Sequence, residues 1–374
     1  MIYLDNAATG GFKPHSVTDA VFSTVRYLCA NPARSGHRLA VTGAEIVLNA
    51  RTLAGELFGV DPDRVVFTKN CTEALNLAIF GTLKKGGHVI TTIYEHNSVL
   101  RPLFALEKGG LISLDVVSPS PKKRLAEVIE EKINPDTYLL VTTAVSNVTG
   151  EVLPVEEIGE VAKKHNLLYL IDGAQGGGHV PLLHTLTGAS MTAFAGHKGL
   201  YGIMGSGMLT FSDGLDIEPI LYGGTGTESF NLYQPVSYPE RLEAGTLNLP
   251  AIAGLKEGLN YVKNNFSSFS EYLYSSSARL IELLGGIDGV TCYSTPNPSG
   301  IVAFNLLNLE SAEVADILNE DYDVAVRSGL HCAPLMHKYL NTDKGGLIRA
   351  SLAVQNSAGE IKYFADAIKK IASR

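Results

Sequence analysis

The chain has 374 residues, of which 45% are hydrophobic and 18% are charged, so it can form a large core and roughly two domains. Its 30 Lys and Arg residues against 38 Asp and Glu residues give a formal net charge of −8, and its longest basic run is residues 122–124. This charge balance argues against nucleic acid and anionic membrane surfaces as partners.

Targeting and redox signals are also weak. The N-terminal sequence lacks the basic and long apolar segments of a signal peptide, and the most apolar long stretch, residues 191–211, contains a histidine and a lysine. We therefore expect no export, no transmembrane span and a cytoplasmic location. The cysteines are widely spaced without a CxxC pair, which favours reduced thiols over disulfides; they are Cys29, Cys71, Cys292 and Cys332.

After an N-terminal arm, residues 1–14, the chain alternates predicted strands and helices. Helices are predicted at residues 44–58, 74–81, 98–107, 125–133 and 155–165, and strands at 65–67, 88–93, 111–117, 137–143, 167–172 and 191–195. Asn70 and Glu73 have the spacing of a capping box, and a helix that begins directly after a strand can bind phosphate. The alternation predicts a mostly parallel sheet with helices on both faces.

The alternation stops near residue 210. Residues 210–249 are rich in Gly, Tyr and Pro, which indicates a long functional or interface loop. Beyond them we predict helices at 250–264, 269–284 and 312–318 and a terminal helix, with strands at 290–293, 301–306, 324–327 and 347–351. We therefore predict an α/β protein with a large domain, residues 15–254, and a smaller α+β domain, residues 255–374.

The most informative strand ends are Asp172, which ends the run 167–172, and Lys198, which follows the run 191–195. Ligands of open α/β sheets bind beyond the carboxyl ends of the strands. A lysine there can form a Schiff base, and an aspartate can hold a protonated ring nitrogen. These are the two polar requirements of pyridoxal phosphate (PLP). Either residue alone would more simply be an ordinary strand end, but the pair favours a PLP site.

Other polar residues follow predicted strands. His96 could stack on a planar cofactor and move a proton, and Asn147 could bind its phenolic oxygen, although a structural histidine and a turn asparagine are the ordinary alternatives. Gln175 lies on the same loop as the aspartate. Glycines 176–178 indicate a turn, because no GxGxxG pattern or P-loop lysine accompanies them. Arg349 could bind a carboxylate with its guanidinium.

Cys332 lies in the sequence RSGLHCAP, in a Gly-containing loop beside Arg327 and His331, and these surroundings could lower the pKa of its thiol and expose it as a thiolate. The alternative is a small buried residue, as we expect for the other three cysteines. Zinc bound by His331, Cys332 and His337 is not expected, because a fourth ligand at suitable spacing is lacking.

Nine motifs in order, LDNAAT, TEALN, EHNS, SNVTG, DGAQ, GHK, EAGTLN, RSGLHCAP and RASLA, resemble the class V, fold-type I PLP enzymes. Within these, the chain is similar to the cysteine desulfurase and selenocysteine lyase family. The resemblance extends from Asp5 to the last predicted helix. The compact RSGLHCAP loop is similar to that of the group-II desulfurases.

The resemblance implies roles for individual residues. The implied catalytic residues are Lys198, Cys332, which accepts sulfur, and His96. The implied cofactor-binding residues are Lys198, Asp172, Gln175, Asn147, Thr72, Cys71, His197, His96 and, from the partner subunit, Thr246. The implied substrate-binding residues are Arg349 and Asn147.

The implied function is conversion of L-cysteine, or L-selenocysteine, to L-alanine by a PLP-dependent homodimer, with a sulfur-acceptor protein as partner. One alternative is another class V reaction, an aminotransferase or cysteine β-lyase, with Cys332 a bystander. Another is a PLP-binding partner in sulfur assembly without desulfurase activity. Three departures from the family pattern concern cofactor binding and sulfur transfer: Ala195 replaces a frequent serine, Gly199 adds a residue, and Leu330 replaces a frequent histidine.

Overall fold

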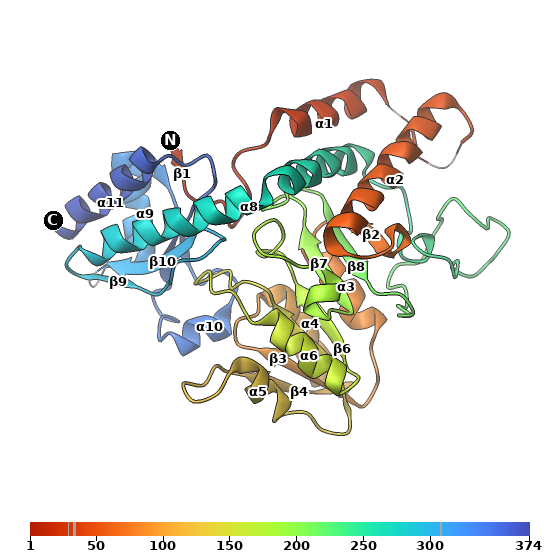
Figure 1. Cartoon of the computed structure of the whole chain (residues 1–374), viewed down its shortest axis with the longest axis horizontal. Helices are drawn as coiled ribbons and strands as arrows, with labels where there is room; N and C mark the ends of the chain where they lie inside the picture. Colours follow the sequence, from red (N-terminus) through yellow and green to blue (C-terminus); the bar gives the residue numbers. More distant parts are fainter. Residues whose placement is uncertain (29, 33–34, 307–308) are drawn as a thin grey trace.

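A mixed sheet forms the centre of the larger part of the molecule (Figure 1) in the computed structural model, which describes residues 1–28, 30–32, 35–306 and 309–374. Cys29 lies outside the described residues. The strands of the sheet are β2 (Val65–Thr68), β3 (Gly87–Thr92), β4 (Ile112–Val117), β5 (Thr137–Thr143), β6 (Leu168–Asp172), β7 (Met191–Ala195) and β8 (Gly207–Phe211). Among the described residues their order is β2-β8-β7-β6-β5-β3-β4.

Only β8 of this sheet, in the described part of the chain, runs antiparallel to its neighbours, β2 and β7. The other neighbouring pairs are parallel, which confirms the mostly parallel sheet. The sequence analysis did not predict β8, because its five residues directly follow a Gly-rich turn and show no signal beyond a short apolar run.

Helices cover both faces of the sheet because successive strand residues point to opposite faces. In β7, Phe194 packs in the core that includes residues of α2, α6 and α8, and Ala193 packs in the core that includes residues of α3 and α4. The helices of this part are α1 (His15–Tyr27), α2 (Arg38–Phe58), α3 (Cys71–Gly81), α4 (Asn97–Lys108), α5 (Leu125–Glu130), α6 (Val155–Lys164), α7 (His184–Thr187) and α8 (Leu249–Gly285), with 3-10 turns at Pro62–Arg64 and Glu240–Leu242.

The C-terminal part contains a second, antiparallel sheet of order β12-β13-β10-β9. Its elements are β9 (Val290–Cys292), β10 (Ile301–Leu306), α9 (Ser311–Tyr322), β11 (Val324–Ala325), β12 (Arg327–Gly329), α10 (Pro334–Tyr339), β13 (Leu347–Ser351) and α11 (Ala358–Ala372). The sequence predicted a single strand at 324–327. The structure has two strands there, β11 and β12, and β11 does not belong to this sheet.

The N-terminal arm belongs with this C-terminal part. Strand β1 (Ile2–Tyr3) pairs in parallel with β11, and Leu4 is fully buried in the C-terminal core. Figure 1 shows the N-terminus beside the C-terminal elements, at a distance from the rest of the N-terminal half. The arm then runs back toward the large sheet.

Helix α8 corrects one prediction. The sequence suggested two helices separated near residues 265–268, but α8 is continuous over 37 residues. That stretch contains neither Gly nor Pro, and its polar side chains bond within the helix: Asn265 Nδ2 donates to the Tyr261 carbonyl at 2.8 Å, and Ser268 Oγ donates to the Asn265 carbonyl at 2.9 Å. The domain boundary near residue 255 lies within α8 and stays a prediction.

Helix α1 was not predicted, because several of its apolar residues are exposed. Val17 is buried, whereas Phe22 and Val25 face outward. In the described part of the chain, every helix is too short or too polar to span a bilayer.

At Gly258, α8 packs closely against the loop that follows Lys198. A Cβ at this position would lie 2.1 Å from the carbonyl oxygen of Leu200. We expect Gly258→Ala to lower the free energy of unfolding by about 2–3 kcal/mol through overpacking. Denaturant unfolding followed by circular dichroism measures the change.

The matched control is Gly285→Ala in the same helix, where a Cβ would meet nothing within 4 Å. Since alanine favours helix over glycine, this variant should match the wild type or gain up to about 1 kcal/mol. Equal stability of the two variants would contradict the close approach at Gly258.

Candidate active site

The carboxyl ends of the parallel strands meet around a cavity of about 220 Å³. The N-terminal arm contributes Ala7 and Ala8 to its lining, and the C-terminal part contributes Arg327, His331 and Arg349. The residues predicted from the sequence that line it are Cys71, Thr72, His96, Asn147, Asp172, Gln175, His197, Lys198 and Arg349. Thr246 and Cys332 are not among the lining residues.

Asp172, the last residue of β6, places a carboxylate at the sheet edge with only 2% of its surface exposed. Its Oδ1 accepts hydrogen bonds from the Cys71 thiol at 3.5 Å and from the Ala174 amide at 2.9 Å. Burial, followed by the charge of Asp172, raises the pKa of Cys71 well above its ordinary value. Cys71 therefore stays a thiol: it is buried, as predicted, and it also donates to the carboxylate.

Lys198 follows β7 after a Gly-His turn. Burial lowers the pKa of its ammonium group, and the carboxylate of Asp172 opposes this shift. At a given pH, Lys198 is therefore in the uncharged amine form more often than an ordinary lysine is. The next residue must be glycine, because a Cβ at Gly199 would lie 2.4 Å from the carbonyl oxygen of Gly177. The added Gly199 thus has a packing role against the triple-glycine turn.

His96 is the N-cap of α4 and is held in one neutral form. Its Nδ1 accepts from the Ser98 amide at 3.0 Å and lies 2.8 Å from the Ser98 hydroxyl, so the ring proton is assigned to Nε2. Burial lowers the pKa of His96 to about 4. Thr72 Oγ1 lies 2.8 Å from the same hydroxyl, which links the first turns of α3 and α4.

Arg349, on β13, is a buried cation with 1% exposure. Its Nη1 donates to the Asn147 carbonyl at 2.8 Å, and its Nη2 forms an ion pair with Asp5 Oδ1 at 3.1 Å. Two of the guanidinium nitrogens therefore already bind the protein. Burial lowers the pKa of Arg349 to about 10, so it remains charged at neutral pH.

Two buried polar atoms at the cavity have no protein partner among the described residues: Arg349 Nε and Asn147 Oδ1. The side-chain nitrogen of Asn147, Nδ2, donates to the His331 carbonyl at 2.7 Å. Buried polar atoms are normally hydrogen-bonded. One donor and one acceptor are therefore available to a ligand with polar groups.

Cys332 lies in an exposed turn between β12 and α10, with φ of 58°. Its carbonyl accepts from the Asn97 amide at 2.8 Å, beside His96, and its Sγ lies 3.9 Å from Arg327 Nη2. His331 brings no charge to the thiol: burial lowers the pKa of this histidine to about 2, so it is neutral. Positive charge at the thiol comes from Arg327 and also from Arg349, whose charge interacts with Cys332.

The N-terminal arm closes one side of the cavity. Gln175 Nε2 donates to the Ala7 carbonyl at 2.8 Å, and His197 Nδ1 lies 3.0 Å from Thr9 Oγ1. The sequence analysis missed the roles of the arm and of Ser98. The LDNAAT motif signalled the arm, but no local pattern signalled which loops it contacts.

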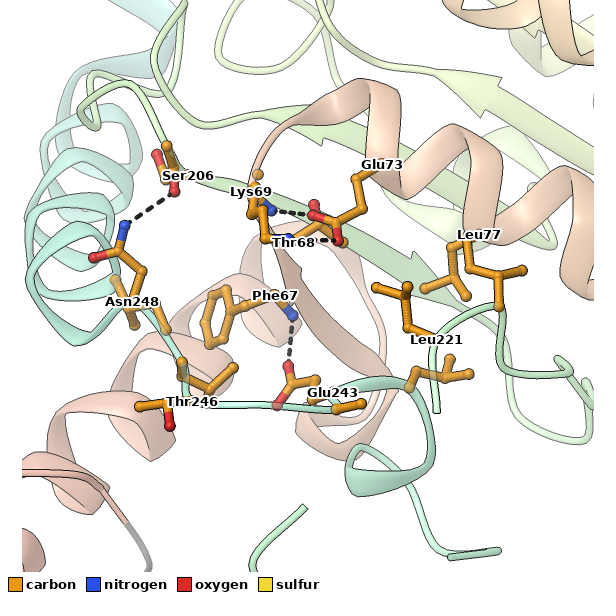
Figure 2. A pocket seen from close by; sticks show the side chains of 17 residues that line it. Phe67, Thr68, Lys69, Glu73, Leu77, Ser206, Leu221, Glu243, Thr246 and Asn248 are labelled. Carbon is orange, nitrogen blue, oxygen red and sulfur yellow. Dashed lines mark hydrogen bonds and ion pairs between the residues drawn. The ribbon is translucent and has the colours of Figure 1, made fainter. Parts of the chain in front are cut away.

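Thr246 lies at a second pocket, of about 430 Å³, which also contains Phe67, Glu243 and Asn248 (Figure 2). Glu243 holds this segment on β2 by accepting from the Phe67 amide at 2.6 Å. Within one chain, Thr246 is therefore not brought to the cavity that contains Lys198.

Comparisons with known proteins agree over nearly the whole chain. A family model described as aminotransferase class-V matches residues 2–364. The chain is 33% identical to a probable cysteine desulfurase of Methanothermobacter thermautotrophicus, covering 99% of this chain and 94% of the relative. It is 30% identical to a cysteine desulfurase of Salmonella agona, covering 99% and 93%. The apo structure of a cysteine desulfurase from Thermococcus onnurineus NA1 matches with a TM-score of 0.93 and 32% identity, covering 100% of this chain and 94% of that chain.

The pKa of His96 gives a direct test of the site. Burial disfavours the imidazolium, so we expect less than about 1% of His96 to be protonated at pH 6.5, where an ordinary histidine is half protonated. Side-chain NMR of histidine-labelled protein, with His96→Gln to assign the signal, measures this. A midpoint near pH 6.5 would show that the ring is solvated.

Proposed function

The chain belongs to the aminotransferase class-V family and groups with its cysteine desulfurases, and from this we propose that it converts L-cysteine to L-alanine and takes the sulfur on Cys332. The expected fold type I architecture is confirmed by the match to a solved desulfurase. The observation that carries the proposal is one cavity lined by Lys198, Asp172 and Arg349, with Cys332 adjacent to the lining residue His331.

The residues at the cavity fit PLP. A buried carboxylate, an amine of lowered pKa and two polar atoms without a partner among the described residues meet there, and α3 begins at its edge, where a helix N-terminus favours an anion. When bound, PLP supplies an electron sink that weakens the bonds at the α-carbon of an amino acid. The residues that would hold it are Lys198, Asp172, Gln175, Asn147, Thr72, Cys71, His197 and His96.

Arg349 would bind the carboxylate of the substrate. Its Nε is a buried donor without a protein partner, and its charge persists at neutral pH. Asp5 and the Asn147 carbonyl fix the plane of the guanidinium, so the donor points in one direction before the substrate arrives. The unpartnered Asn147 Oδ1 is an acceptor for a polar hydrogen of the substrate.

Proton transfer would involve Lys198 and His96. The lowered pKa of Lys198 makes its amine a base that can take the α-proton of cysteine. The Nε2–H of neutral His96 is a proton donor close to the turn that contains Cys332, because the neighbouring Asn97 amide is bonded to the Cys332 carbonyl.

Sulfur transfer would occur at Cys332. Its thiolate attacks the sulfur of the substrate, so an S–S bond forms while the Cβ–S bond breaks, and the electron pair of the broken bond stays with the three-carbon skeleton. Protonation of that skeleton gives alanine. Arg327 Nη2, 3.9 Å from Sγ, would place a positive charge beside the persulfide that forms there.

Two alternatives predict different products. An aminotransferase or cysteine β-lyase would not need Cys332, and a PLP-binding partner without desulfurase activity would release no product from cysteine. The exposed position of Cys332 at the turn favours sulfur transfer over both. L-Selenocysteine as a substrate, a sulfur-acceptor protein and a cytoplasmic location stay predictions.

A homodimer is supported by the segment between β8 and the 3-10 turn Glu240–Leu242. Figure 1 shows this segment projecting away from the sheet and its helices. Phe230 and Leu232 of this segment are almost fully exposed, and apolar side chains exposed on a projecting loop indicate a protein contact. A second copy of the chain covering this loop would also allow the exposed Thr246 to reach the partner's cavity.

Turnover of L-cysteine tests the proposed reaction. With a thiol reductant present, the PLP-loaded protein should release alanine and sulfide in equal amounts, and Cys332→Ser should retain less than about 1% of this rate because the nucleophile is lost. Cys292→Ser is the control, since Cys292 lies in β9 and is partly buried away from the cavity.

The other product patterns identify the alternatives. Pyruvate and ammonia would indicate a β-lyase, whereas transfer of the amino group to a 2-oxo acid would indicate an aminotransferase. Full activity of Cys332→Ser would contradict the proposal that sulfur is transferred to Cys332.

Sedimentation tests the dimer. We expect a species of twice the 39.9 kDa chain mass. Replacing Phe230 and Leu232 together by Ser should weaken it by removing apolar contact area. Tyr274→Ser, at an exposed aromatic residue of α8, should leave it unchanged. A wild-type protein that remains monomeric at all concentrations would contradict the dimer.

A further inference from the structure

Behind the turn that contains Cys332 lies a row of three buried polar side chains: His331, His337 and Thr342. Their exposed fractions are 2%, 0% and 6%. His331 Nδ1 lies 3.4 Å from His337 Nε2, and His337 Nδ1 lies 2.9 Å from Thr342 Oγ1. At the other end, His331 Nε2 lies 3.4 Å from the Arg327 carbonyl. The proposed chemistry uses neither His337 nor Thr342.

Both rings are neutral. Burial lowers the pKa of each histidine, and the nearby Arg349 cation lowers that of His331 further. Each ring therefore has one N–H donor and one nitrogen acceptor. Every contact in the row can be a hydrogen bond only if each group donates to the next in the same direction along the row.

The direction follows from the two ends. The Arg327 carbonyl can only accept, so His331 Nε2 must carry the proton, which leaves His331 Nδ1 as an acceptor for His337 Nε2–H. His337 Nδ1 is then an acceptor, and the Thr342 hydroxyl donates to it. The other acceptor of that hydroxyl, the His337 carbonyl, is more distant at 3.4 Å and already accepts from the Thr342 amide at 2.9 Å. The opposite direction would place a bare ring nitrogen against the carbonyl of Arg327.

This row supports a strained turn. His331 and Cys332 have φ of 48° and 58°, a left-handed conformation that is unfavourable for residues other than glycine. The Asn147 side chain and the Asn97 amide hold the two carbonyls of the turn. The row holds the side chain of His331 from the opposite side and ties it to the backbone of Arg327, the residue whose guanidinium faces Cys332.

We propose that Thr342 and His337 are positioning residues for sulfur transfer: a one-directional row of hydrogen bonds from the Thr342 hydroxyl through His337 and His331 to the Arg327 carbonyl fixes the turn and thereby the reach of Cys332. The inference rests on the proposed desulfurase function, and neither residue touches the substrate or the cofactor. Loss of the hydroxyl leaves His337 Nδ1 without this donor and removes one of the two ring contacts, with His331 Nδ1 at the other end, that select the tautomer of His337.

The test compares Thr342→Val, which keeps the shape and removes the hydroxyl, with Thr342→Ser, which keeps the hydroxyl. In the PLP-loaded enzyme, Thr342→Val should lower kcat for alanine release about 10- to 100-fold through misplacement of the nucleophile, with KM for cysteine within about twofold of wild type. Thr342→Ser should restore kcat to within about threefold of the wild type. Thermal unfolding confirms that both variants are folded at the assay temperature.

A second measurement does not depend on turnover. Ring-nitrogen NMR of the wild type should show one tautomer for both histidines, with the proton on Nε2, and Thr342→Val should show a mixture for His337. The variants His331→Gln and His337→Gln assign the signals.

The outcomes separate this inference from the proposed function. A wild type that releases no alanine overturns the proposed function. The NMR measurement still tests the direction of the hydrogen bonds in the row, because it does not depend on turnover. An active wild type with unchanged kcat in Thr342→Val, or a proton on Nδ1 of His337 in the wild type, overturns the positioning role.

Discussion

One buried cation joins the three segments that form the cavity. Arg349 comes from the small sheet, binds the Asn147 carbonyl of the large part and pairs with Asp5 of the N-terminal arm. A buried guanidinium is tolerated only when most of its N–H groups have partners, so the three segments must stay together to satisfy it. The guanidinium nitrogen Nε, which has no partner among the described residues, is also a donor left for a substrate carboxylate.

Desolvation decides the protonation of the other groups at the cavity. It keeps His96 neutral, favours the amine of Lys198 and keeps Cys71 a thiol beside Asp172. The same burial would favour neutral forms in any enclosed site. What makes this one suited to amino-acid chemistry is the combination of a buried carboxylate, a base and a buried cation around one space, with an exposed thiol at its edge.

Cys332 and the projecting loop with Phe230 and Leu232 are exposed instead. Both are surfaces at which something must arrive: a sulfur acceptor at the thiol and a second copy of the chain at the loop, under the function proposed. The row of His331, His337 and Thr342 is buried next to the thiol in sequence, in α10 and in the turns on either side of it. Under the proposed positioning role, the row keeps Cys332 in place for sulfur transfer although Cys332 is exposed.

Local sequence determined much of this protein. The strand and helix alternation, the capping of α3 by Asn70, the turn at the triple glycine and the strand ends at Asp172 and Lys198 follow from short-range periodicity and turn chemistry, which act over a few residues. The ordered motifs indicated the family and nine of the cavity residues. The predicted break in α8 was wrong because Asn and Ser weaken a helix without ending it when their side chains bond within it.

Only the tertiary structure decided the rest. The pairing of β1 with β11, the bond from Asp5 to Arg349 and the contacts from residue 331 to residue 337 and from residue 337 to residue 342 depend on where distant or looped segments meet. The neutrality of His331 depends on burial by several segments at once. No local pattern predicts such contacts or such a pKa shift, because both depend on which segments the assembled fold brings together and buries away from water.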